Sequence, residues 1–500
     1  MGHIELNTSD IKLCLGAAEV SAAYLGDEKV YPNKLPNYFA IELKNTADIT
    51  LSFEWSVSAV TPHSLDLEFS YDCKTWYIFD PTDTKSTNEI GNSEIAVNTI
   101  PLSTNGNFGR KVYIRGNNNF INNNTSRYYH FVSSSAADFK ISGNIMSLLN
   151  AYSFEELNTV NSMCFAHLFD GFTNCDAEDL LLPAQNLGTF AYNAMFVRSK
   201  IYKTPSVLPA TNVSDYSYNS MFLQCSLITT TPEILAKTIG EGACQNMFNG
   251  CTGLTSTRDF APTTLSNDSC AYMFNGCTNL LTAMESLPVK NIPARACQYM
   301  FKGCSKLTAT PFVGEDEYTL GTVGDYGCYC MFRDCTALQT TQDMLWFRTI
   351  STYGYSNMYY NCTSLTKSPD LYMNSVGTNG CSFMFNGCTS LTTSPAGLPP
   401  TTLASSCYLS MFKDCTSLMM APILPAETLA DGCYNNMFNG CTSLNYIKAM
   451  FLTTPSITYT SGWTQGVSAN GIFVKNEDAV WNVTGSNGIP SGWTVRTASA

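Results

Sequence analysis

One short sequence unit recurs through more than half of the chain and constrains its fold more than any other feature. The unit reads Met-Phe-x-x-Cys-x-x-Leu, and eleven copies follow one another, beginning with a degenerate copy at Leu168 and Phe169. The copies are 26 or 27 residues apart, except for one interval of 31 residues. A fixed period of this length is typical of a solenoid, in which each unit packs on its neighbours. We therefore predict that residues 162–444 form one solenoid of about eleven units. Four complete copies supply the predicted repeat core residues Met247, Phe248, Cys251, Met273, Phe274, Cys277, Met384, Phe385, Cys388, Met437, Phe438 and Cys441.

The residue types around the Met-Phe step suggest the local structure of one unit. Cys or Tyr usually stands four residues before the Phe, and a small residue four before the Met, which predicts a short helix with one buried face. Gly250 and Asp414 are examples of residues after the Phe that tolerate the left-handed backbone ending a helix. Residues 391–395 are predicted to form a short strand, and residues 424–429 to lead into the next helix with a Thr cap. The solenoid would then be of the α/β class.

The same unit resembles the BspA-type leucine-rich repeat. This family is known from surface proteins of Bacteroidetes and other bacteria, and from phages that infect them. The resemblance covers the solenoid region from about Ser162 to Leu444. It implies a leucine-rich-repeat solenoid that serves binding or adhesion, and it implies no catalysis.

Composition narrows the classes of partner. Hydrophobic residues make up 44% of the 500 residues, which is ample for a core, and the formal net charge is −13. A basic footprint for nucleic acid is absent from the sequence. The sequence also has no apolar run long enough to cross a bilayer, so no membrane insertion is expected. The start, MGHIELNTSDIKLCLG, lacks a basic region followed by an apolar segment, so we expect no Sec-type export signal.

The 21 Cys residues mostly stand in columns set by the repeat. A stacked column of small hydrophobic residues predicts free, buried thiols. Disulfides between columns are the alternative. A zinc site is a remote one, because no Cys-x-x-Cys pair recurs with the partner spacing of a closed site. No cofactor is expected.

A small duplication lies near the N-terminus. The Leu-Gly pairs at residues 15–16 and 25–26 are each followed four residues later by Val, which predicts short strands joined at Gly turns. The pattern resembles an opening common in phage and prophage tail or fibre proteins. The resemblance implies that residues 1–35 dock to other virion proteins; an ordinary terminal hairpin is the alternative.

The chain is predicted to be multidomain. Alternating stretches in residues 36–140, such as Lys111 to Gly116, predict an all-β, sandwich-like domain. Residues 141–161 are expected to cap the first coil, because an uncovered solenoid end exposes core. Residues 445–500 leave the repeat and predict a small β cap whose core includes the three Trp residues Trp463, Trp481 and Trp493.

One irregular unit is a candidate binding site. The 31-residue interval carries Glu315, Asp316 and Glu317, and the following unit carries Trp346 in place of the usual Pro-rich link. An acidic loop near an exposed Trp suggests a site for a cation or a sugar ring. A solvated loop beside a packed Trp is the alternative.

Catalytic motifs are absent from the sequence. None of the four His residues neighbours a nucleophile motif, and no G-x-S-x-G, P-loop or H-E-x-x-H occurs. A pair of carboxylates for glycoside hydrolysis stays open, because its members can be distant in sequence.

These observations lead to one main hypothesis. The chain is expected to be a non-enzymatic virion protein, a tail or head fibre or appendage, that presents its repeats to a host surface glycan or protein. Phage fibres are often trimers, so a homo-oligomer such as a trimer is expected by resemblance. A bacterial cell-surface or secreted adhesin is the alternative, and a glycan-degrading enzyme is a remote one.

Overall fold

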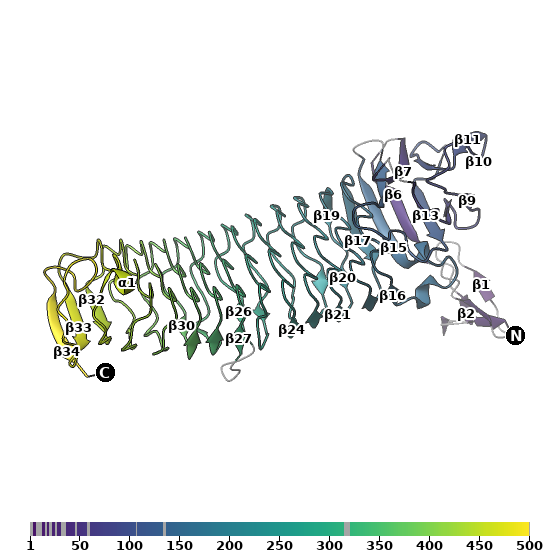
Figure 1. Cartoon of the computed structure of the whole chain (residues 1–500). Helices are drawn as coiled ribbons and strands as arrows, with labels where there is room; N and C mark the ends of the chain where they lie inside the picture. The colour runs from purple at the N-terminus through teal and green to yellow at the C-terminus, as the bar shows by residue number, and fades with distance from the viewer. Residues whose placement is uncertain are drawn as a thin grey trace.

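The computed structural model forms an elongated rod of stacked coils (Figure 1). It describes residues 37–499 except 46–47, 58–60, 107, 134–136 and 315–320, and the backbone of five short strands among residues 1–36. Those strands are β1 (Ile4–Leu6), β2 (Leu13–Leu15), β3 (Ala18–Glu19), β4 (Ala23–Leu25) and β5 (Glu28–Tyr31). They pair antiparallel in the orders β1-β2-β3 and β4-β5.

Two antiparallel arrangements form the N-terminal unit. One is the three-stranded sheet β12-β7-β14, and the other is the β6-β13-β8-β9 part of a seven-stranded sheet. Phe131 of β14 lies between them, 4.5 Å from Phe53 and 5.8 Å from Phe39 between ring centroids. The strands of this unit are β6 (Phe39–Leu43), β7 (Ile49–Trp55), β8 (Leu67–Ser70), β9 (Tyr77–Ile78), β12 (Thr99–Leu102), β13 (Lys111–Gly116) and β14 (Tyr129–Ser133), with a hairpin of β10 (Thr87–Ile90) and β11 (Ser93–Ala96).

The seven-stranded sheet continues without a break into the coils. Its strand β15 (Phe139–Asn144) pairs antiparallel with β6 and parallel with β17 (Cys175–Leu181), which pairs parallel with β19 (Ile201–Lys203). The 3-10 helices η1 (Ile145–Leu148) and η2 (Phe154–Glu156) follow β15. The N-terminal unit and the first coils therefore share backbone hydrogen bonds as well as a core.

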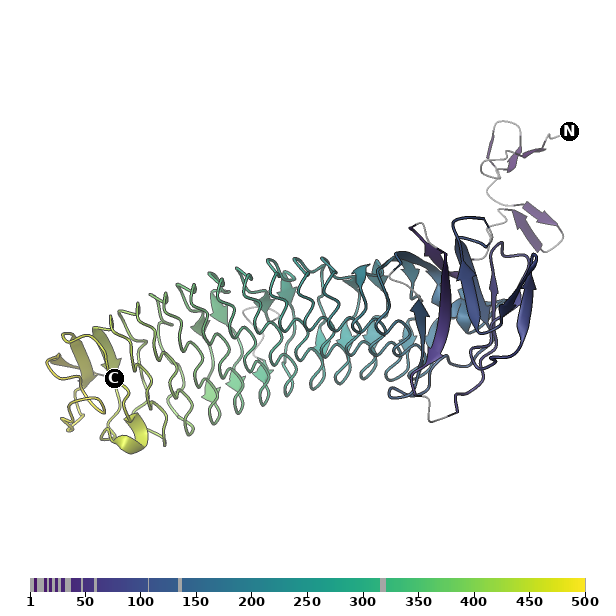
Figure 2. The ribbon, with the colours of Figure 1, turned by 90° about the horizontal axis from the view of Figure 1, so that it is seen from above.

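The coils form a β-solenoid of about 13 turns, which confirms the prediction of a solenoid. Very short parallel strands recur along the rod in two lines (Figure 2). The first line contains β20 (Val207–Leu208), β22 (Glu233–Ile234), β25 (Ser286–Leu287), β26 (Phe312–Val313), β28 (Met344–Leu345) and β30 (Asp370–Leu371). The second contains β16 (Thr159–Val160), β18 (Asn186–Leu187), β21 (Asn212–Val213), β23 (Thr238–Ile239), β24 (Thr264–Leu265), β27 (Thr322–Val323), β29 (Thr349–Ile350) and β31 (Ser375–Val376).

The predicted short helix around each Met-Phe step is wrong, and the solenoid is almost entirely β structure and turns. In residues 242–251 the backbone takes positive φ at every fourth residue, with values of 55° at Gly242, 57° at Asn246 and 73° at Gly250. The backbone therefore winds as successive four-residue turns, which we call the turn spiral. A period of four also places residues i and i+4 on one face, which explains why the burial pattern resembled that of a helix.

Backbone hydrogen bonds explain why the turn spiral replaces a helix. The Met247 N–H donates to the Cys244 carbonyl three residues back (3.2 Å), whereas the next N–H, of Phe248, donates to the Met273 carbonyl one coil further along (2.8 Å). An α-helix would satisfy its interior donors internally and leave the neighbouring coil without these bonds. Hydrogen bonds within a coil alternate with hydrogen bonds to the next coil, and the second kind holds consecutive coils together.

The predicted strand at residues 391–395 is also wrong. Only Thr393 pairs there, as an isolated bridge to Lys367. The N–H groups of Thr392 and Thr393 both donate to the Thr366 carbonyl, so this segment is a corner of the coil and not an extended ladder. The Thr-Leu step, which was expected to cap a helix, instead forms strands of the second line such as β24.

A column of stacked aromatic rings fills the solenoid. Between Phe196 and Tyr359 neighbouring rings lie 5.3–5.6 Å apart between centroids and are almost parallel. The column begins with Phe131 of the N-terminal unit and ends on Trp463. Its members, which we call the aromatic column, are Phe131, Phe169, Phe196, Phe222, Phe248, Phe274, Phe301, Phe332, Tyr359, Phe385, Phe412, Phe438 and Trp463.

The repeat Cys residues lie beside this column and are buried. In the Cys column that follows the Met-Phe step, each thiol from Cys225 to Cys441 donates to the carbonyl of the aromatic residue one coil earlier, as Cys277 Sγ does to Phe248 (3.1 Å) and Cys441 Sγ does to Phe412 (2.9 Å). Burial raises the pKa of the Cys277 thiol to about 12, so it stays protonated at neutral pH. The protonated form is the one that can donate this hydrogen bond.

Residues after the last sequence copy continue the solenoid. The parallel strands β32 (Tyr446–Ala449), β33 (Ile472–Asn476) and β34 (Thr494–Ala498) close the rod, with the four-residue helix α1 (Ile457–Thr460) beside them. Trp463, Trp481 and Trp493 are buried, and each indole N–H donates to a backbone carbonyl. Among the described residues, no helix has the length and apolar character that a membrane span requires.

Candidate binding face

The first line of strands presents a face on which constant and variable residues alternate. In each of its six strands the first residue is at least partly exposed and the second is buried. The buried residues are all aliphatic, because they complete the core. The outward residues are Val207, Glu233, Ser286, Phe312, Met344 and Asp370. We call the outward side of these strands, together with the equivalent residues of the intervening coils, the grooved face.

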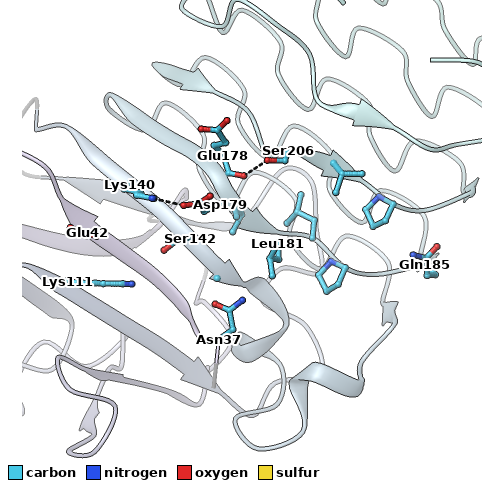
Figure 3. Close-up of a pocket in the computed structure, with 16 residues that line it drawn as sticks. Asn37, Glu42, Lys111, Lys140, Ser142, Glu178, Asp179, Leu181, Gln185 and Ser206 are labelled. Atoms are coloured by element: carbon cyan, nitrogen blue, oxygen red, sulfur yellow. Dashed lines mark hydrogen bonds and ion pairs between the residues drawn. The ribbon is translucent and has the colours of Figure 1, made fainter. Parts of the chain in front are cut away.

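One hollow, of about 730 Å³, lies where the N-terminal unit meets the first coils (Figure 3). Lys140 of β15 forms an ion pair with Asp179 of β17, and the Ser206 hydroxyl donates to the Glu178 carbonyl (2.7 Å). The hydrogen bond to Asp179 raises the pKa of Lys140. The strand β17 carries a bulge here, since its register against β15 shifts between Lys140 and Ser142. Leu181 contributes exposed apolar surface, so the hollow is amphipathic.

A second hollow, of about 350 Å³, lies further along the grooved face. Three acidic residues, Glu233, Asp259 and Glu285, and one basic residue, Lys237, contribute to its lining. Because acidic side chains predominate, this part of the face favours neutral or cationic groups.

A third hollow, of about 410 Å³, is mostly apolar. Its lining includes Gly397, Pro399 and Ile423, and its one charged residue is Asp370. The chemistry of the grooved face therefore changes along the rod, from mixed charge through acidic to apolar. A volume of this size falls within the range of about 300–1,000 Å³ typical of small-molecule sites.

Of the four predicted site residues, the structure describes only Trp346. Glu315, Asp316 and Glu317 lie outside the described residues. Trp346 follows β28 on the grooved face, where it is partly exposed. Its ring contacts that of Tyr372 in the next coil, with centroids 5.4 Å apart and planes inclined by 49°. A pairing with Tyr372 was not predicted, although its spacing of 26 residues from Trp346 is one repeat and could have indicated it.

A polar cluster on the turn spiral of the first coils was also not predicted. Asp170 accepts from the Tyr128 hydroxyl (2.7 Å) and from Arg198 (2.9 Å), and lies 3.3 Å from His167 Nδ1. Tyr128 stacks on His167 at 4.0 Å between ring centroids. Burial raises the pKa of Asp170, but the hydrogen bonds from these three partners outweigh burial and lower it to about 2. The cluster connects the N-terminal unit to the coils.

In the described part of the chain, no group of three or more acidic, His or Cys side chains is arranged to hold a metal ion.

Comparison with known proteins assigns no family to the chain. No protein-family model matches it, and no curated protein matches it. A leucine-rich repeat protein from Bacteroides ovatus ATCC 8483 is similar, at 15% identity over 64% of this chain and 83% of that one, with a TM-score of 0.27. A leucine-rich repeat protein from Eubacterium ventriosum ATCC 27560 has 13% identity over 70% and 94% of the two chains and a TM-score of 0.26. The TLR13–ssRNA13 complex has 13% identity over 58% and 45%, with a TM-score of 0.24.

Proposed function

We propose that the chain is a non-enzymatic structural protein of a phage particle, a tail or head fibre or appendage, that attaches the particle to a host-cell glycan or protein. The observation that carries the proposal is the grooved face. Its buried residues repeat from coil to coil, whereas its outward residues and hollows differ. A rigid scaffold with a varied outer surface is suited to recognition, because the scaffold loses little conformational freedom on binding.

The repeat supports the assignment to the BspA type. The Met-Phe-x-x-Cys-x-x-Leu unit that resembles this family is the part of each coil that builds the aromatic column and its thiol hydrogen bonds. Several weak sites along one rod would add to attachment through multivalency, and a homo-oligomer such as a trimer would multiply the effect. The sandwich-like N-terminal unit and residues 1–35 are proposed to hold the rod on the particle.

The buried thiols support assembly in a reducing compartment. Nineteen described Cys residues are buried, and those that follow the Met-Phe step, such as Cys251, Cys335 and Cys415, use their S–H groups as donors. Unpaired thiols in such numbers are at risk of mispairing where folding occurs under oxidising conditions. This favours the cytoplasm of a host cell, where virions assemble. Thiol titration in denaturant without reductant is expected to find most of the 21 Cys residues free; fewer than half would count against this argument.

The first experiment is mass spectrometry of gradient-purified phage particles and of washed host membranes. Recovery in stoichiometric amounts with the particles is the expected result. Recovery only with the host envelope would overturn the virion role and favour a bacterial surface adhesin of the same repeat type. Purified chain is also expected to compete with particles for adsorption to host cells, and a failure to compete would remove the attachment role.

The remote alternative, a glycan-degrading enzyme, is tested by measuring the turnover of host polysaccharide. Host polysaccharide incubated with the purified chain is expected to keep its chain length, as measured by size-exclusion chromatography. Depolymerisation would contradict a purely binding role.

A further inference from the structure

We propose that the third hollow, beside Trp346 and Tyr372, binds a neutral hexose residue of a glycan. The inference rests on the proposed attachment function and adds the ligand class and the place. The site consists of the hollow, whose lining is an apolar floor with one carboxylate, and of an aromatic wall beside it. The rings of this wall, Trp346 and Tyr372, stand two residues after the lining residues Met344 and Asp370. Three consecutive coils contribute to it: Trp346 follows β28, Asp370 and Tyr372 belong to the coil of β30, and Gly397 lies in the next coil.

Trp346 and Tyr372 form the aromatic wall. Trp346 and Tyr372 follow β28 and β30, which pair in register, so their rings lie side by side at 5.4 Å. Tyr372 is 43% exposed, so its ring is available to a ligand. Aromatic rings offer a large, stiff apolar surface with few rotatable bonds. One face of a hexose ring presents several C–H groups and can stack on such a surface.

The floor of the hollow is Gly397. In the column that contains Met344 and Asp370, the next two coils supply Gly397 and then Ile423, which pairs with it. A Cβ atom added at Gly397 would lie 3.5 Å from the Ile423 carbonyl oxygen and 3.7 Å from its Cβ, which is ordinary van der Waals contact. The fold therefore has room for a side chain here. Its absence leaves the opening of about 410 Å³ between Asp370, Pro399 and Ile423.

Asp370 supplies the polar group. One of its oxygens accepts from the Ala396 N–H (2.8 Å), which orients the carboxylate at the edge of the hollow. A carboxylate is a strong acceptor for sugar hydroxyl groups. The nearby Lys367 pairs with Asp343 (3.0 Å), so the charge that lines the hollow is negative. This complementarity favours a neutral hexose over a uronic or sialic acid, because a second carboxylate would be repelled.

An apolar peptide side chain is the competing ligand for an apolar hollow. The observations favour the hexose, because the carboxylate and the exposed rings together match a ring that has hydroxyl groups at its edge and C–H groups on its face. An apolar peptide side chain would offer no hydrogen-bond donor to the second carboxylate oxygen of Asp370.

The test uses saturation-transfer NMR with the full chain and the methyl pyranosides of glucose, galactose and mannose, with methyl glucuronate as the acidic probe. Binding of at least one neutral glycoside is expected, and weaker or no binding of the glucuronate. Trp346→Ala is expected to weaken binding roughly tenfold, since it removes half of the aromatic wall. Gly397→Met is expected to abolish it by filling the hollow. The matched control is Ser286→Met, which places the same side chain at the equivalent residue of β25, and circular dichroism checks that each variant is folded.

The outcomes separate this inference from the proposed function. Absence of binding to all three neutral glycosides, or binding that both Trp346→Ala and Gly397→Met leave unchanged, overturns the hexose site. Equal or tighter binding of an apolar peptide, lost in the same variants, overturns it in favour of a peptide site. If the hexose site fails but the chain still competes for adsorption, attachment stands. If hexose binding is found but the chain is absent from particles, the site stands and the virion role fails.

Discussion

The turn spiral and the grooved face are two sides of the same coils, and they use the repeat in opposite ways. On the turn spiral, each coil places an aromatic ring, a small residue and usually a Cys in the same contacts as the coil before. On the grooved face only every second position is fixed in character, and the outward positions range from Glu233 to Phe312. The difference teaches that one side supplies the stability of the rod, which leaves the other side able to vary.

The largest effect is expected for a ring in the middle of the aromatic column. Phe301 lies 5.3 Å from Phe274 and 5.4 Å from Phe332, and it is fully buried. Phe301→Ala is expected to lower the free energy of unfolding by about 3–5 kcal/mol, because it leaves a cavity and removes two stacking contacts. Urea unfolding followed by intrinsic fluorescence measures the change. Tyr372→Ala on the grooved face is the control, with an expected change within about 0.5 kcal/mol; equal effects would erase the distinction between the two sides.

A pH titration tests the charged part of the turn spiral. The folded pKa of Asp170, about 2, lies below its ordinary value of 3.8, so the ionised form is stabilised by folding. This contribution, roughly 1–2 kcal/mol after allowance for the exposed Arg198, is present above about pH 4 and is lost as the pH falls toward 2. Asp170→Asn is expected to remove this pH dependence from the free energy of unfolding. Asp343 lies near the grooved face with a side chain that is 93% exposed, and Asp343→Asn is expected to leave the pH dependence of the free energy of unfolding unchanged.

Backbone strain provides a smaller effect. Ala194 is buried on the turn spiral with a φ of 50°. Ala194→Gly is expected to raise the free energy of unfolding by about 0.5–1 kcal/mol, because Gly adopts the left-handed region without the Cβ clash. Thermal unfolding monitored by circular dichroism measures this difference as a higher midpoint temperature for the Gly variant. A lower midpoint for the Gly variant would mean that the turn spiral tolerates Cβ atoms without cost.

The smallest effect concerns a hydroxyl group in the core. The Tyr355 hydroxyl is buried and has no hydrogen-bond partner in the described part of the chain. Tyr355→Phe is expected to leave the free energy of unfolding unchanged or to raise it by up to about 1 kcal/mol. Tyr128→Phe is the matched change, and it should lower the free energy by about 1 kcal/mol because its hydroxyl donates to Asp170. A loss of stability in Tyr355→Phe would point to a buried water that bonds the hydroxyl group.

The comparison also shows where sequence reasoning reached its limit. The period and the Met-Phe step sufficed to predict the solenoid. The i, i+4 burial stripes were interpreted as a helix, since periods of 3.6 and 4 cannot be told apart over eight residues. Gly242, Asn246 and Gly250 in one coil carried a signal for left-handed turns at every fourth position. Tyr272 and Phe383 adopt the same backbone in other coils without any such signal, because cross-coil bonding imposes it.

What the sequence determined by itself was the repeat and everything that follows from one unit: coils of 26 or 27 residues, a ring in every coil and a thiol beside it. What only the tertiary structure decided depends on register between coils. Trp346 meets Tyr372, and Gly397 opens a hollow in front of Ile423, only because parallel pairing places residues one period apart side by side. The physical reason is that a neighbouring coil competes for backbone hydrogen bonds, and a single unit read alone has no neighbour.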